Sequence, residues 1–80
     1  MTLSIDVVTS PDRERLVAEI WHDREMVAEL NCEDGSQVYV EVLVPGPART
    51  ASMPYEEFAS VLEAARSRLL ERLKAASASG

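Results

Sequence analysis

The chain contains little cysteine, little histidine and no long hydrophobic run. Its 80 residues include one cysteine, Cys32, and one histidine, His22. A single cysteine excludes an internal disulfide, and nothing in the sequence resembles a signal peptide or an apolar stretch of membrane-spanning length. These absences predict a cytoplasmic protein without membrane contact.

Basic charge is also scarce. The chain has 14 acidic and 8 basic side chains, which gives a net charge of -6. An acidic domain repels phosphate groups, so we expect no direct contact with nucleic acid. Two interpretations of the negative charge stay open: attraction of a basic protein partner, and solubility alone.

The patterns that mark catalytic and metal sites are missing. His22, with Asp23, Glu25 and Cys32 nearby in the sequence, matches no zinc-binding spacing. We therefore interpret His22 as a turn residue and Cys32 as a small buried side chain. The chain also lacks a glycine-rich phosphate loop. The sequence thus predicts no metal, no cofactor and no enzymatic activity; only an ion bound at His22 or a deep pocket would reopen that question.

Four stretches alternate or repeat in the manner of β-strands. Residues 3–7 alternate apolar and polar side chains. Residues 26–30 nearly repeat the sequence of residues 16–20, and the run 38–42 follows them. Pro11 interrupts the first stretch because proline cannot donate to a strand ladder. Pro45 begins a loop that we expect over 45–53.

Two hairpin loops of three residues each set the predicted strand register. The loops are 22–24 and 33–35, and Gly35 holds the position that requires a left-handed backbone. Arg24 holds the same position in the first loop, which predicts strain or a different loop there. The predicted partners on the inner face are Leu16–Leu30, Ala18–Ala28, Ile20–Met26, Leu30–Val38, Ala28–Val40 and Met26–Val42. On the other face they are Trp21–Glu25, Glu29–Tyr39 and Val27–Glu41. Both hairpins place the same residues inside, which supports the fold.

A long amphipathic helix is predicted from Pro54, which suits the first helical position. Acidic side chains open it and basic ones lie toward its end, an order that complements the helix dipole. Its apolar stripe comprises Tyr55, Phe58, Leu62, Ala65, Leu69, Leu73 and Ala76. About 20 residues would make a rod roughly 30 Å long. Such a rod extends past a small sheet, so we expect Leu69, Leu70 and Leu73 to be available to a second copy.

The predicted fold class is therefore α+β. We expect an antiparallel β-meander of about four strands with one long C-terminal α-helix packed on one face. Residues 1–76 should form a single domain with element order ββββα, and residues 77–80 a flexible tail.

The sheet face away from the helix collects an unusual mixture of side chains. We predict a protein-binding face there, because Trp and Tyr are frequent anchors of interfaces. The predicted partner-binding residues are Trp21, Tyr39, Glu19, Glu29, Glu41, Val27 and Leu43. The competing interpretation is an ordinary solvated face.

The run Glu19-Ile20-Trp21-His22-Asp23-Arg24-Glu25-Met26-Val27-Ala28-Glu29, with Tyr55-Glu56-Glu57-Phe58, carries a resemblance to known sequences. It resembles small uncharacterised bacterial and phage-associated acidic proteins with an E-I-W-x-D-G-E-x-x-A-E core and a D-E-F helix start. Arg24 replaces the glycine of that core. The resemblance implies no catalytic residues. By size and charge alone, the chain is similar to anti-CRISPR inhibitors, which occupy a protein surface or mimic DNA.

The leading functional prediction is a non-enzymatic module that binds a protein partner with a basic, nucleic-acid-handling surface. In this prediction the carboxylates attract the partner, while Trp21 and Tyr39 act as buried anchors. The alternative is a structural homodimer, which would depend on Phe58, Leu62, Leu69 and Leu73.

Overall fold

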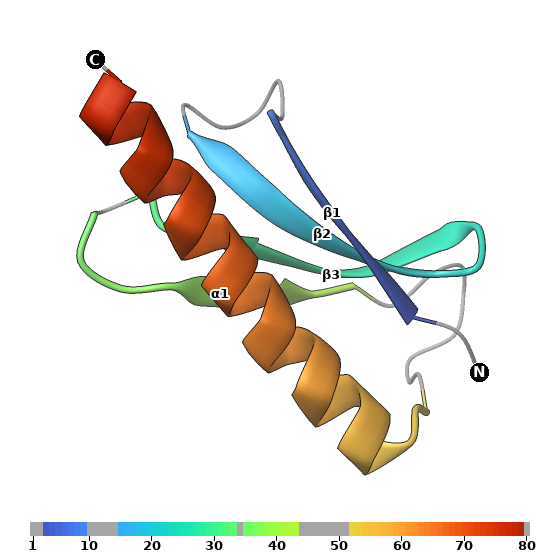
Figure 1. Cartoon of the computed structure of the whole chain (residues 1–80). Helices are drawn as coiled ribbons and strands as arrows, with labels where there is room; N and C mark the ends of the chain where they lie inside the picture. The colour runs from blue at the N-terminus through green and yellow to red at the C-terminus, as the bar shows by residue number, and fades with distance from the viewer. Residues whose placement is uncertain (1–2, 10–14, 34, 44–51, 80) are drawn as a thin grey trace.

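The structure, a computed structural model, describes residues 3–9, 15–33, 35–43 and 52–79. Strands β1 (Leu3–Thr9), β2 (Leu16–His22), β3 (Glu25–Asn31) and β4 (Tyr39–Val42) form one antiparallel sheet in the order β1-β2-β3-β4. Helix α1 (Tyr55–Ser79) lies diagonally across one face of this sheet (Figure 1). This arrangement confirms the predicted α+β meander with one C-terminal helix.

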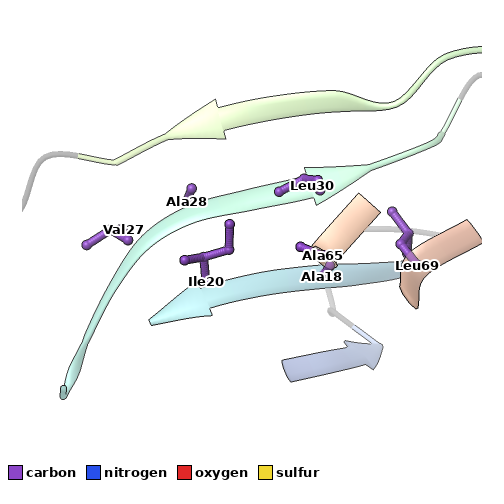
Figure 2. Close-up of a cluster of buried hydrophobic side chains, with 7 residues drawn as sticks. All are labelled: Ala18, Ile20, Val27, Ala28, Leu30, Ala65 and Leu69. Carbon is purple, nitrogen blue, oxygen red and sulfur yellow. The ribbon is translucent and has the colours of Figure 1, made fainter. Parts of the chain in front are cut away.

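Alternation along the strands decides which side chains pack under α1. The buried cluster combines small and branched side chains of β2 and β3 with two helix residues (Figure 2): Ala18, Ile20, Val27, Ala28, Leu30, Ala65 and Leu69. Leu3, Ile5 and Val7 of β1 pack against it. At a typical 25 cal/mol per Å² of apolar surface, this burial is the main stabilising contribution to a domain of this size.

The predicted register between β2 and β3 is wrong by two residues. Ala18 pairs with Leu30, and Ile20 pairs with Ala28. Nearer the turn the register shifts at a bulge beside Ile20 and Trp21, so that Trp21 pairs with Met26 and His22 with Glu25, not Trp21 with Glu25. Away from the bulge, a two-residue shift keeps the side chains on their predicted faces, because the side-chain period of a strand is two.

The turn between these strands also differs from the prediction. The paired residues His22 and Glu25 leave a loop of Asp23 and Arg24, and His22 is the last residue of β2 instead of a turn residue. The positive φ of 55° falls on Asp23. Aspartate adopts the left-handed region more readily than arginine, so this turn avoids the strain expected at Arg24.

The second hairpin repeats the two-residue shift. Leu30 pairs with Val40 and Ala28 with Val42, while on the opposite face Asn31, not Glu29, pairs with Tyr39. The predicted Val27–Glu41 pair is replaced by Glu29–Glu41. Gly35 does have the predicted positive φ, at 80°, and its N–H donates to the Cys32 carbonyl over 3.1 Å.

Helix α1 begins one residue later and ends later than predicted. Pro54 precedes it and accepts the Phe58 N–H at 3.0 Å, while Tyr55 is 80% exposed and lies outside the apolar contact. The helix spans 25 residues and ends at Ser79, within the predicted flexible tail. Leu69 is fully buried against the sheet, so it is not available to a second copy.

The helix covers part of the sheet. Within the described residues α1 contacts β1, β2 and β3 but not β4. Val40 and Val42, predicted as core, are consequently 48% and 58% exposed. The described residues include no helix that is both long and apolar enough to cross a membrane. The strand break at Pro11 and the loop over 45–51 lie outside the described residues, as does the side chain of Ala76.

Candidate functional site

The main feature of the sheet face opposite α1 is a line of four carboxylates, one from each strand. Asp6 pairs with Glu19, Glu19 pairs with Glu29, and Glu29 pairs with Glu41. We call these four residues the carboxylate row. Adjacent strands lie about 4.8 Å apart, so the row spans about 14 Å from β1 to β4.

The row follows from the way each strand alternates. Every carboxylate stands between two apolar residues whose side chains point to the α1 face. These apolar neighbours are Ile5 and Val7, Ala18 and Ile20, Ala28 and Leu30, and Val40 and Val42. Glu19 and Glu29, on the central strands, are half-buried, whereas Asp6 and Glu41 are exposed. The structure therefore presents negative charge across the full width of the sheet.

Trp21 lies beside the row on the same face. Its indole Nε1 donates a hydrogen bond to Oε1 of Glu19 at 3.1 Å, and the residue is half-buried. The hydrogen bond connects residues two apart on one strand, which fixes the ring next to the carboxylate. Trp21 therefore offers an apolar ring surface at the edge of the anionic row, as predicted from its place in the strand.

Tyr39 and Leu43 flank Glu41 along the other edge of the same face. Tyr39 is 49% exposed and Leu43 is 37% exposed. Both are two residues from Glu41, so all three side chains share one side of the chain. The structure thus brings six of the seven predicted partner-binding residues onto one face.

Val27 is the exception, because its predicted position on the free face is wrong. It is 3% exposed and belongs to the buried cluster. The bulge between β2 and β3 leaves Val27 as the extra residue of β3, between Met26 and Ala28, and β3 bends there (Figure 2). A bulge redirects side chains, and this one moves Val27 from the expected free face into the interior.

The face is not open along its whole length. Val17, two residues from Glu19 on β2, is fully buried, and Asn31, two residues from Glu29 on β3, is 5% exposed. The accessible part of the face therefore consists of the carboxylate row and the Trp21 side, together with the β4 edge.

Asp6 is a member of the row that the sequence interpretation missed. Its alternation with Ile5 and Val7 already marked it as a side chain facing away from the core. Its place in the row depends on the register between β1 and β2, which pairs it with Glu19. Only with that register does Asp6 become part of the same charged line.

Other candidate chemistry lies apart from the row. His22 Nε2 and Asp23 Oδ2 are 3.5 Å apart at the turn, an ion pair only when the histidine is protonated. Cys32 is a free, buried cysteine, as predicted. Within the residues that the structure describes, no three His, Cys, Asp or Glu side chains are grouped closely enough to hold a metal ion.

Fold and site together define a small α+β domain with one helix-covered sheet face and one acidic sheet face. No protein-family model, curated protein or solved structure matches the chain.

Replacing Glu19 by glutamine is expected to stabilise the domain. Glutamine keeps an oxygen that can accept the Trp21 indole N–H, but removes the charge between Asp6 and Glu29. Like charges directly opposite one another cost about 0.2–1 kcal/mol, so the free energy of unfolding in urea at low salt should rise by that amount. The gain should shrink in about 1 M salt, where the screening length falls to about 3 Å.

The control is Glu71→Gln, which changes an exposed carboxylate on α1. It should leave the free energy of unfolding within about 0.5 kcal/mol, as for most surface substitutions. A Glu19→Gln protein with wild-type stability at low salt would show that the row carries no repulsion.

Proposed function

We propose that this protein is a non-enzymatic, cytoplasmic binding module that covers a basic surface of a protein partner with its acidic sheet face. In its most concrete form it is an inhibitor of the anti-CRISPR kind, which blocks a surface that handles nucleic acid. The observation that carries this proposal is the carboxylate row, with Asp6, Glu19, Glu29 and Glu41 in register across all four strands.

The row supports a binding role because it opposes folding stability. Like charges placed directly opposite each other on a sheet are destabilising. Core packing requires polar residues at these positions, but does not require that they carry the same sign. Departures from a local rule of this kind are typical of functional sites.

The spacing of the charges favours a partner that normally binds phosphates. Lysine and arginine side chains that bind a nucleic-acid backbone contact closely spaced negative charges. A row of carboxylates about 5 Å apart presents a comparable line of charge. Such charges chiefly increase the association rate and select the partner, whereas large side chains that lose water on binding supply much of the affinity.

Trp21 and Tyr39 are the side chains suited to that second role. Trp21 is held beside Glu19 by its hydrogen bond, which lowers the entropy lost when it is covered. Tyr39 is about half exposed and lies next to Glu41 on β4. Together they place aromatic surface at both sides of the row.

The test compares two double variants that each remove one aromatic ring and reverse one charge. Trp21→Ala with Glu29→Lys alters the acidic face, whereas Tyr55→Ala with Glu71→Lys alters exposed positions of α1. Immobilised wild-type protein and both variants are used to capture proteins from a bacterial lysate. The affinity of each captured protein is then measured with purified components over a salt series.

We expect the face variant to lose at least about tenfold in affinity, equal to about 1.4 kcal/mol, while the helix variant binds like the wild type. Wild-type binding should also weaken as salt rises. Circular dichroism and urea unfolding verify that both variants are folded. If the folded face variant retains wild-type affinity for every captured protein, the acidic face is not the binding surface.

A further inference from the structure

Strand β4 forms one edge of the sheet that the structure describes. The Leu43 N–H donates to the Val27 carbonyl at 2.9 Å, and the register pairs Glu41 with Glu29. In an antiparallel ladder the residues that bond to a given neighbour alternate. The backbone groups of Glu41 and Leu43 therefore point to β3, and those of Val40 and Val42 point away from it. The outer side of β4 thus has the geometry to pair with a further strand.

A groove runs beside this edge on the helix side of the sheet. It has a volume of about 680 Å³ and lies between β4, the loop before it and α1. Val38, Val40, Leu62 and Leu70 give it apolar walls, and Glu63 and Arg66 lie at its rim, 3.6 Å apart. We call this hollow the β4 groove. It exists because α1 covers β1, β2 and β3 but stops short of β4.

The carboxylate row ends at the same edge, on the opposite face. Glu41 is the last of the four carboxylates and is exposed. A strand added beside β4 would extend the row by one position. Side chains of the added strand would alternate between the β4 groove and the acidic face.

We propose that an extended segment of the protein partner adds to β4 as a fifth strand, with apolar side chains in the β4 groove and alternate lysine or arginine side chains beside Glu41. Strand addition to an open edge is an established mode of peptide recognition, in which the backbone supplies affinity and alternate side chains supply specificity. This inference rests on the proposed function, because it takes the partner to be a protein with basic side chains.

Charge favours this occupant over a second copy of the chain. Residues 38–43 contain no lysine or arginine, so two β4 strands paired with each other would bring no cation to the row. Each copy also has a net charge of -6. A partner strand with a basic residue on this face would place opposite charges side by side, which stabilises cross-strand pairs.

The experiment uses the full chain and three synthetic peptides whose ends are acetylated and amidated, so that the terminal charges are removed. One alternates valine and lysine, one alternates valine and glutamate, and one has the lysine peptide's composition with its valines and lysines in separate blocks. Binding is measured by titration, and the amide protons are followed by hydrogen exchange. Val42→Pro removes an N–H that points off the sheet, a change that edge strands tolerate. Val42→Thr keeps the N–H and the branched shape as a matched control.

We expect the alternating lysine peptide to bind at least about tenfold more tightly than the other two peptides. It should slow exchange at the Val40 and Val42 amides more than at Glu41, whose N–H already faces β3. Val42→Pro should weaken binding by about tenfold, a loss of about 1.4 kcal/mol, and Val42→Thr should not. The exchange pattern in the wild type supplies a result that does not depend on how the proline variant folds.

Three results would overturn the inference. Failure of all three peptides to bind would exclude strand addition. The proposed function would still be tested separately, by comparing the proteins that the wild type and the acidic-face variant capture from lysate. Peptide binding that perturbs Trp21 but leaves the β4 amides unchanged would support the acidic face without the fifth strand. Sedimentation showing a dimer that Val42→Pro dissociates would assign the β4 edge to a second copy instead.

Discussion

Replacing Leu69 by alanine is expected to lower the free energy of unfolding by about 2–5 kcal/mol, the range for a large-to-small change in a packed core. Leu69 is fully buried and lies with Ala65 on the helix surface that faces β2 and β3 (Figure 2). A domain of this length has a total stability of about 4–12 kcal/mol, so the variant could lose half of it. Urea unfolding followed by circular dichroism measures the change.

The neighbouring leucine supplies the control for this prediction. Leu70 is half-buried and lines the β4 groove. Leu70→Ala should therefore cost clearly less than Leu69→Ala, because the deleted atoms are partly in contact with water. Equal losses at both positions would contradict the packing of α1. A Leu69→Ala protein with unchanged stability that dissociates from a dimer would restore the role first predicted for this residue.

The faces of the strands could be predicted from the sequence, but the partners across the strands could not. Alternation fixed that Ala18, Ile20, Ala28 and Leu30 point to the same side. It cannot distinguish registers that differ by two residues, because each gives the same inside and outside. Both hairpins deviate by this amount away from the bulge, and the strands keep their predicted faces there, whereas Val27 at the bulge does not.

Turn chemistry accounts for the register of the first hairpin but not for that of the second. Gly35 was placed correctly in the left-handed region because glycine adopts it without a steric penalty. In the first turn a shorter loop assigns that conformation to Asp23, and the bulge near Trp21 then compensates for the changed loop length. A bulge adds one residue to one strand, and no residue pattern in this chain marked its position.

The position of the helix over the sheet likewise could not be predicted from the spacing of apolar residues. The apolar stripe predicted that Ala65 faces the sheet, but not which strands lie beneath it. Val40 and Val42 carry core-like side chains on a strand that α1 does not contact. The β4 groove therefore could not be derived from the sequence, although its valines were assigned to the correct face.

The sequence predicts that the acidic side chains share one face of the sheet, but not that they lie next to one another in a row. Glu19, Glu29 and Glu41 were assigned to one side of the sheet by alternation alone. In the predicted register Glu29 paired with Tyr39, which would have separated the charges. The observed pairing of Glu19 with Glu29 and of Glu29 with Glu41 brings them together and adds Asp6. Proximity of Glu19, Glu29 and Glu41 thus depends on the same two-residue shift, and Asp6 joins them through the register between β1 and β2.

Replacing Val27 by aspartate is expected to destabilise the domain by about 3 kcal/mol or more, the cost of leaving a buried charge without compensation. Val27 is 3% exposed in the interior, where a carboxylate would lose most of its hydration. Urea unfolding of the full chain measures the effect, and Val27→Thr, which adds only a hydroxyl group, should give a smaller loss.

The matched control is the same substitution at Val42, the residue on β4 that is 58% exposed. Val42→Asp should change the free energy of unfolding by less than about 1 kcal/mol, because the carboxylate stays in water and strand propensities span only about that range. The two valines would respond alike if Val27 lay on the free face, as its alternation in the sequence suggested. A large difference between them is expected from the bulge, which leaves the carboxylate row, Trp21 and the β4 edge on the accessible part of the acidic face and places Val27 in the interior.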